Sequence, residues 1–231
     1  MKSLLALAAL LIASGCATTS GNSDPKDPWE PLNRATYGFN DALDKAVLKP
    51  IAQGYVWVLP EFARAGVTNF FENISDVGTG INNILQGKVA QGGSDLGRFA
   101  FNSVVGIFGL WDVATPLGLE KHYEDFGQTL GWWGMPSGPY LVIPLFGPST
   151  LRDAPAKYVD SYTGYYPYVD DMAVRNSLFG LGIVSTRANL LQSEKILDEA
   201  ALDKYTFVRD AWLQRRRNQV YDGSPPREKE E

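Results

Sequence analysis

Apolar residues recur along most of this chain at intervals of three and four, the spacing that one face of a helix requires. In the clearest stretch, Ser94 and Asp95 stand as a candidate N-cap before the periodic residues Leu96, Phe99, Ala100, Val104, Ile107, Phe108 and Trp111. Phe101 and Val105 widen this apolar stripe, so we expect the helix to be covered on two sides, by protein or by lipid. Further helices are predicted at 60–73, 76–86, 171–192 and 202–221.

The segment 131–152 breaks this helical pattern. Its sequence, GWWGMPSGPYLVIPLFGPSTLR, places glycine or proline every few residues between large apolar side chains, so we expect no helix here. A strand over 140–143 and turn chemistry over 135–139 predict an apolar hairpin or extended loop. Two interpretations remain open: the segment packs into the core, or it presents a patch edged with Trp and Tyr to a membrane interface.

The beginning of the chain has the layout of a bacterial lipoprotein signal. A short apolar run follows Lys2 and ends in Ala13, Ser14, Gly15 and Cys16, so we expect 1–15 to be a removable signal peptide and Cys16 to carry acyl chains. The run is too short to span a bilayer, which takes roughly 20 residues. Ala17 follows where an aspartate would favour the inner membrane. These features predict an outer-membrane protein held by lipid.

The composition at both ends of the chain differs from that of its middle. We expect 16–27 to be the lipidated terminus and a flexible tether, because it is small, polar and rich in breakers. The charged, proline-containing stretch 222–231 is predicted to be a disordered tail. One helical domain over 28–221 is therefore expected between them.

Charge and residue types exclude several functions. The net charge of −5 becomes −6 when Lys2 leaves with the signal peptide, which disfavours a nucleic-acid partner. His122 is the only histidine and Cys16 the only cysteine, so we predict neither a metal site nor a nucleophilic catalytic centre. Glycines at 92–97 lack the lysine of a phosphate-binding loop. The carboxylate pairs at 124–125 and 170–171 are interpreted as helix starts or loops. Arginines at 215–217 complement a helix dipole as well as they would bind a phosphate.

Several motifs, taken in order, resemble those of a known family. They are DPWEPLNRATYGFND (27–41), NFFENI (69–74), RFAFN (98–102), GIFGLWDVA (106–114), EDFGQTLGW (124–132), GPYLVIPLFGPSTLRD (138–153) and YTFVRDAWLQRR (205–216). With the lipoprotein signal, this sequence resembles the MlaA (VacJ) outer-membrane lipoproteins from residue 27 to about residue 217. It departs from them in its short tail after Tyr221.

The resemblance implies a mostly α, ring-shaped single domain with a central amphipathic channel, embedded in the inner leaflet of the outer membrane and facing the periplasm. Its function would be to remove mislocalised phospholipids from the outer leaflet and to maintain lipid asymmetry, without catalysis or a cofactor. The implied partners are outer-membrane phospholipid, a trimeric porin and a soluble periplasmic lipid carrier. The alternative is a scaffold lipoprotein that binds a porin or envelope partner and transports nothing.

The same resemblance implies that the apolar hairpin lies beside the channel. We therefore assign Trp132, Trp133, Tyr140 and Phe146 to lining or gating as a hypothesis, with Phe39 and Asn40 adjacent to the channel or packed in the core. Gly138 and Gly147 would be hinges, which a proline at either position should stiffen without lowering the protein level.

Overall fold

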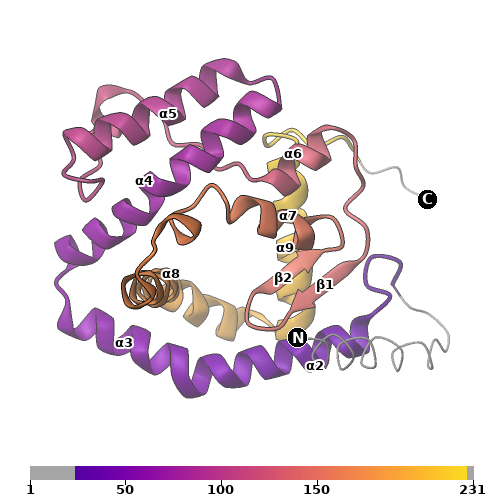
Figure 1. Cartoon of the computed structure of the whole chain (residues 1–231). Helices are drawn as coiled ribbons and strands as arrows, with labels where there is room; N and C mark the ends of the chain where they lie inside the picture. The colour runs from indigo at the N-terminus through magenta and orange to yellow at the C-terminus, as the bar shows by residue number, and fades with distance from the viewer. Residues whose placement is uncertain (1–23, 228–231) are drawn as a thin grey trace.

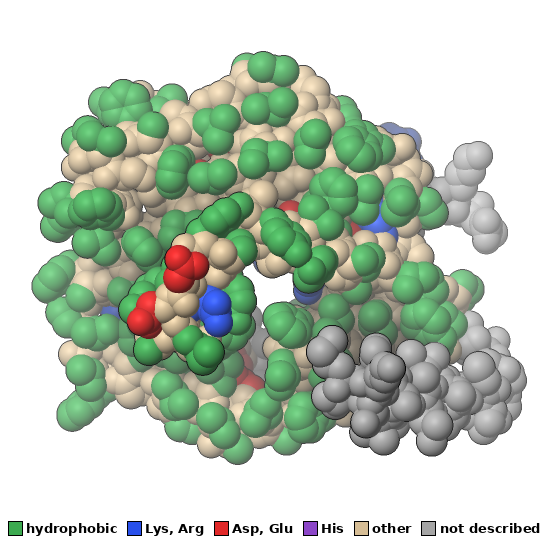
Figure 2. Space-filling model, in the orientation of Figure 1, with side chains coloured by type: hydrophobic (Ala, Val, Ile, Leu, Met, Phe, Trp, Pro, Cys, Tyr) green, Lys and Arg blue, Asp and Glu red, His purple; other side chains and the backbone are tan. Residues whose placement is uncertain are grey.

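The protein is mostly helical, which confirms the predicted fold class. A computed structural model describes residues 24–227, except for the side chains of 195–200. The predicted signal peptide, Cys16 and most of the tether therefore lie outside the described residues. Helices run around the rim of the molecule, and a small two-stranded hairpin completes the circuit (Figure 1). In the space-filling view an opening remains near the centre, so the described part of the chain has the shape of a ring (Figure 2).

The first arc of the ring is one long, bent helical rod. It consists of α2 (Glu30–Leu43), the π-helical turn η2 (Asp44–Leu48) and α3 (Lys49–Val58). Pro50 has no N–H group to continue the usual i→i−4 ladder, and the N–H of Lys49 bonds to the carbonyl of Asp44 instead. A π-helical turn widens the rod locally, which explains how the helix passes a proline and follows the curve of the ring.

The next arc is a pair of helices that cross very closely. The pair consists of α4 (Glu61–Leu85) and α5 (Val89–Val104). A Cβ atom added to Gly92 would lie 2.7 Å from the carbonyl oxygen of Gly80, so only glycines allow this approach. Gly92 therefore belongs to a helix–helix contact, and the stretch 92–97 lies within α5 and does not form a ligand loop.

Two sequence predictions for these helices were wrong in their boundaries. The stretches 60–73 and 76–86 form the single helix α4, because nothing between them breaks the backbone ladder. The helix predicted from Leu96 begins at Val89 and ends at Val104, so Ser94 and Asp95 lie inside it. Beyond α5 the backbone of Ile107 and Phe108 is left-handed, which ends the helix despite the apolar periodicity.

The hairpin lies between two short helices. Helix α6 (Phe126–Trp132) leads into β1 (Tyr140–Ile143), which pairs antiparallel with β2 (Gly147–Thr150) before α7 (Asp153–Asp160). The predicted strand over 140–143 is thus confirmed. The expectation that no helix enters 131–152 was wrong at its start, because Gly131 and Trp132 form the last residues of α6. Asp125 begins α6 by accepting the N–H of Gln128, as its interpretation as a helix-start residue predicts.

Two helices complete the structure. The long helix α8 (Met172–Ala200) packs against α3 and α4, and α9 (Lys204–Val220) runs behind the hairpin (Figure 1). Both were predicted within a few residues at their starts, although α8 extends eight residues beyond position 192. None of the helices in residues 24–227 is both long and apolar enough to cross a bilayer.

Candidate functional site

The distribution of side chains is inverted relative to an ordinary soluble protein. Large apolar side chains are exposed in every arc of the ring and appear as green patches over the face in Figure 2. One group of strongly exposed apolar residues lies at the α3–α4 corner and at the end of α5, where Asn69 of α4 donates a hydrogen bond to the Leu110 carbonyl. We call this group the apolar edge; it consists of Trp57, Val58, Phe62, Val104, Val105 and Phe108. Trp57 is 87% exposed and Phe62 79% exposed.

The interior, by contrast, is rich in polar and charged residues. Arg98 is buried between α5 and the loop that follows it, where it donates to Thr115, Asp112 and the Leu119 carbonyl. Burial alone would raise the pKa of Asp112, but hydrogen bonds from Thr115 and Arg98 lower that pKa to about 2. An apolar exterior around a hydrogen-bonded interior is the pattern expected when part of the exterior contacts lipid.

A second ionic cluster joins α6, α7 and α9. Both terminal nitrogens of Arg216 lie 2.6 Å from the carboxylate oxygens of Asp125, and its Nε donates to Asp153 at 2.9 Å. Burial alone would raise the pKa of Asp153, but Arg216 and Arg152 together hold it below its ordinary value. Among the arginines at 215–217, Arg216 therefore forms buried ion pairs that connect three helices, and it is not merely a partner of the helix dipole.

The hairpin is held to α2 by two asparagines spaced two helical turns apart. Asn33 donates to the carbonyl of Tyr140 at 3.0 Å and accepts the N–H of Val142 at 2.9 Å. Asn40 repeats the arrangement at the turn, where it donates to the carbonyl of Ile143 at 3.1 Å and accepts the N–H of Leu145 at 2.8 Å. These side-chain amides satisfy the free edge of β1 as a third strand would. Sequence reasoning identified Asn40 but missed Asn33.

Asp27 anchors the other end of this arrangement. It is fully buried and accepts hydrogen bonds from Asn33 at 2.8 Å and from Arg209 at 3.3 Å, with a third from the hydroxyl of Tyr205. The last residue of the predicted tether thus binds both α2 and α9, so the prediction of a flexible tether over 16–27 was wrong at its end. Sequence reasoning missed this role, although Asp27 stands in the DPWEPL motif that carried part of the family resemblance.

The structure separates the residues predicted to line or gate a channel. Trp132 and Trp133 lie at the end of α6, where Lys88 sits over the Trp132 ring and the indole N–H of Trp133 donates to the Leu85 carbonyl. Tyr140 is fully buried and packs edge-on against Tyr205 and Trp212. Part of the hairpin segment packs into the core, because Tyr140 and Val142 of β1 are buried, while Leu145 and Phe146 at its tip are exposed. Contact of the tip with a membrane interface stays a prediction.

Only the hairpin tip gathers several of the predicted residues. Phe146 is exposed in the turn, and Asn40, which binds the neighbouring Leu145, follows the exposed Phe39 on α2. Phe39, Asn40 and Phe146 thus share one region, whereas Trp132, Trp133 and Tyr140 belong to others. The gating roles stay predictions for all six.

The two predicted hinge glycines occupy backbone conformations that proline cannot adopt. Gly138 has φ +67° and Gly147 has φ +74°, whereas proline fixes φ near −65°. The expectation that proline would stiffen the hairpin and leave the protein level unchanged was therefore wrong, because either substitution breaks the turn. A milder substitution tests what these glycines contribute.

Alanine at Gly138 should lower the free energy of unfolding by about 1–3 kcal/mol, because a side chain is strained at positive φ. Its Cβ would also lie 3.1 Å from Cβ of Leu151. The matched control is Gly93→Ala, since Gly93 is helical with nothing within 4 Å of its added Cβ, and there stability should rise by about 0.5–1 kcal/mol. Urea unfolding in detergent measures both. Equal effects at Gly138 and Gly93 would contradict the conclusion that the positive φ of Gly138 requires glycine.

His122, the residue on which any catalytic or metal site was conditional, is engaged in the interior. Its Nδ1 lies 2.9 Å from Oδ1 of Asp95, which also accepts a hydrogen bond from Asn83 at its other oxygen. No group of three or more His, Cys, Asp or Glu residues in the described part of the chain is arranged to hold a metal ion.

Comparison with known proteins gives consistent results. The family model described as MlaA lipoprotein matches residues 25–219. The chain is 35% identical over 220 residues to the "Intermembrane phospholipid transport system lipoprotein MlaA" of Escherichia coli (strain K12), covering 92% of this chain and 86% of that protein. It is 30% identical to the protein of the same name from Haemophilus influenzae, covering 100% of this chain and 96% of the relative.

A solved structure shares the fold. It is described as "Structural basis for maintenance of bacterial outer membrane lipid asymmetry", and it superposes with a TM-score of 0.74 at 32% identity. The match covers 84% of this chain and 98% of the solved chain, so it includes almost the whole of that chain.

Proposed function

Because this chain belongs to the MlaA lipoprotein family, we propose that it removes mislocalised phospholipids from the outer leaflet of the outer membrane. In this proposal the lipids pass through an amphipathic channel to a soluble periplasmic carrier, and lipid asymmetry is maintained. The observation that carries the proposal is the ring with an apolar exterior around a central opening (Figure 2). Such a body can lie in one leaflet and still offer a path through it.

The transported molecule has a charged headgroup and apolar tails, so its path must suit both. Removing a headgroup from water without hydrogen-bond partners costs several kcal/mol. Helix α7 and the segment between α7 and α8 lie on the inner side of the ring of helices in Figure 1. Tyr158 on α7 and Tyr162 and Tyr168 in that segment are all exposed. Their hydroxyls form hydrogen bonds with one another and with the backbone, while their rings are apolar. Such side chains suit the wall of an amphipathic path.

We propose that acyl chains on Cys16 hold the protein on the periplasmic side of the outer membrane. Three chains anchor durably, since each buried methylene contributes about 0.8 kcal/mol. A trimeric porin and a periplasmic carrier would be the protein partners. No catalytic step is part of the proposal, and His122→Ala should therefore leave phospholipid turnover unchanged.

The primary test compares surface phospholipid in cells with and without this gene. Loss of the gene should raise the phospholipid content of the outer leaflet, and the intact gene should restore it. Phospholipid that co-purifies with the detergent-extracted protein would support transport. A folded porin complex that contains no lipid, together with an unchanged outer leaflet in the deletion strain, would favour the scaffold alternative.

Asn40→Ala should impair lipid removal while the protein remains folded. The substitution removes both hydrogen bonds that hold the hairpin turn to α2, and each neutral hydrogen bond contributes about 1 kcal/mol. Outer-leaflet phospholipid in a complemented deletion strain should then approach that of the strain without the gene. The control is Thr36→Ala, because among the described residues the Thr36 hydroxyl bonds only within α2, to the Leu32 carbonyl. Normal lipid asymmetry with Asn40→Ala would show that lipid removal does not depend on these two hydrogen bonds between α2 and the hairpin turn.

A further inference from the structure

Apart from the central opening, the structure has a hollow between α9 and the segment that connects α6 to β1. These elements lie toward the right-hand side of Figure 1. Its volume is about 850 Å³, within the range of about 300–1,000 Å³ typical of small-molecule sites. Its wall carries four cationic side chains and one carboxylate, namely Lys26, Arg152, Arg216, Arg217 and Asp210. A lining of this kind favours an anionic ligand.

Arg152 is the side chain best placed to bind that ligand. It is only 7% exposed; its Nε donates to Asp153 at 2.8 Å and its Nη1 donates to the Met135 carbonyl at 3.3 Å. The structure shows no hydrogen bond for Nη2 within the described residues, yet that atom is not sealed from solvent. A buried guanidinium with one nitrogen left for a further acceptor is thus held at the wall of the hollow.

The backbone is shaped around this guanidinium. A Cβ atom added to Gly131 would lie 2.6 Å from Nη1 of Arg152 and 2.9 Å from a methyl of Val220. Glycine at this position therefore lets the end of α6 approach both the charged group and the apolar wall. Met135, Leu213, Val220 and Tyr221 supply the rest of that wall.

We propose that this hollow binds the phosphodiester of a phospholipid headgroup, with Arg152 as its principal donor. Guanidinium groups match the geometry of phosphate oxygens, and hydrogen bonds between two charged groups are among the strongest in proteins. The apolar wall suits the glycerol and the first carbons of the acyl chains. Asp210 opposes any anion here, so it limits the affinity.

The position of the hollow favours a lipid over a free phosphate. Pro25, nine residues after Cys16, lies in its wall. An extended chain of that length reaches at most about 32 Å, so the acyl anchor proposed above keeps the hollow close to the membrane surface. The preference for a lipid phosphate over a free phosphate depends on the proposed anchoring through Cys16, whereas the anion site itself does not depend on it.

The test is calorimetric titration of the full mature protein in a nonionic detergent. Dihexanoyl phosphatidylglycerol is the lipid probe, and glycerol 3-phosphate and inorganic phosphate are the free-phosphate probes. We expect the lipid to bind more tightly than either small anion. Equal affinity for inorganic phosphate, with the same dependence on Arg152, would overturn the lipid source and leave only a phosphate site.

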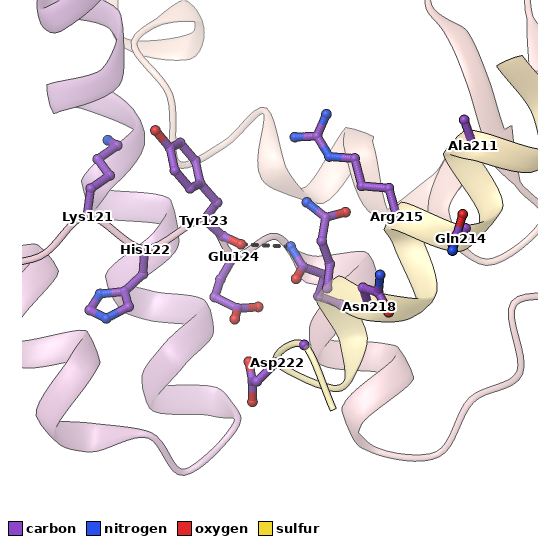
Figure 3. Close-up of a pocket in the computed structure, with 12 residues that line it drawn as sticks. Lys121, His122, Tyr123, Glu124, Ala211, Gln214, Arg215, Asn218 and Asp222 are labelled. Carbon is purple, nitrogen blue, oxygen red and sulfur yellow. Dashed lines mark hydrogen bonds between the residues drawn. The ribbon is translucent and has the colours of Figure 1, made fainter. Parts of the chain in front are cut away.

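Three variants decide whether this hollow is responsible. Arg152→Gln should weaken lipid binding at least about tenfold, the loss expected for one charge-assisted hydrogen bond. Asp210→Asn, a change at a carboxylate that is itself 58% exposed, should strengthen binding about twofold or more without affecting the fold. The matched control is Arg215→Gln. Arg215 lies on α9, as Asp210 does, but it faces a different hollow, beside Tyr123 (Figure 3).

Either of two results would overturn the proposal. One is an unchanged affinity in a folded Arg152→Gln protein. The other is an Asp210→Asn protein that binds the lipid no better than the natural sequence does. This second test remains valid even if Arg152→Gln fails to fold.

Discussion

Replacing Arg216 by leucine should lower the free energy of unfolding by about 3–5 kcal/mol, the usual loss when one member of a buried ion pair is removed. Arg216 is the common partner of Asp125 and Asp153, and it thereby joins α6, α7 and α9. Without it, Arg152 is the one ion-pair partner that the nearly buried carboxylate of Asp153 keeps among the described residues. Urea unfolding in detergent measures the loss.

The effect of Arg216→Leu should depend on pH in a defined direction. Arg216 lowers the pKa values of Asp125 and Asp153 despite their burial, so its stabilisation is present above the ordinary carboxyl pKa. That stabilisation is lost as the pH falls through the lowered folded-state values. The difference between the natural protein and the variant should therefore be largest near pH 7 and should narrow below about pH 4.

Arg215→Leu is the matched control for this prediction. Arg215 is adjacent in sequence and exposed, and the structure shows no ion pair for it within residues 24–227. A surface change of this kind should alter stability by no more than about 0.5 kcal/mol. Similar losses for the two variants would mean that Arg216 acts through general helix properties and not through its cluster.

Placing glutamates on the apolar edge should weaken membrane binding about 100-fold. The variant carries Trp57→Glu, Phe62→Glu and Val104→Glu, at three of the most exposed apolar positions. A carboxylate costs about 3 kcal/mol at the centre of a bilayer and less near its surface. Three carboxylates at partial depth should therefore remove roughly 3 kcal/mol of binding free energy, which corresponds to about 100-fold.

The measurement is co-sedimentation with vesicles of phosphatidylethanolamine and phosphatidylglycerol, using residues 17–231 so that acyl chains do not mask the effect. Gln91→Glu, Asn176→Asp and Gln192→Glu add the same charge at exposed polar positions outside the hollow proposed above and serve as the control. If both triple variants bind vesicles equally well, the apolar edge does not contact lipid. Their unfolding curves should match, since all six positions lie at the surface.

The long helices were predictable because apolar periodicity is a local property. The starts of α8 and α9 and the strand β1 could be read from spacing alone. The end of α5 could not, because Ile107 and Phe108 continue the apolar pattern while their backbone turns left-handed. The bent rod from Glu30 to Val58 was not predicted at all, although its motif carried part of the family resemblance.

Part of the candidate site was also accessible from the sequence. Asn40 and Phe146 were selected, and they lie together at the hairpin tip. The partners Asn33 and Asp27 were missed because an asparagine or aspartate near a helix start suggests a local cap. Their actual partners are Tyr140, more than a hundred residues away, and Arg209 near the carboxyl end. No spacing rule links such positions.

By itself, the sequence determined the helical class, the lipoprotein signal and the excess of apolar residues over what one ordinary core would bury. These follow from local periodicity and composition, which any arrangement of the helices would preserve. Only the tertiary structure decided which side those residues face. Buried polar groups must find partners, and Asp27, Arg98 and Arg216 find theirs on other helices or loops of the ring. The polar side chains therefore occupy the interior, and many large apolar ones are left outside.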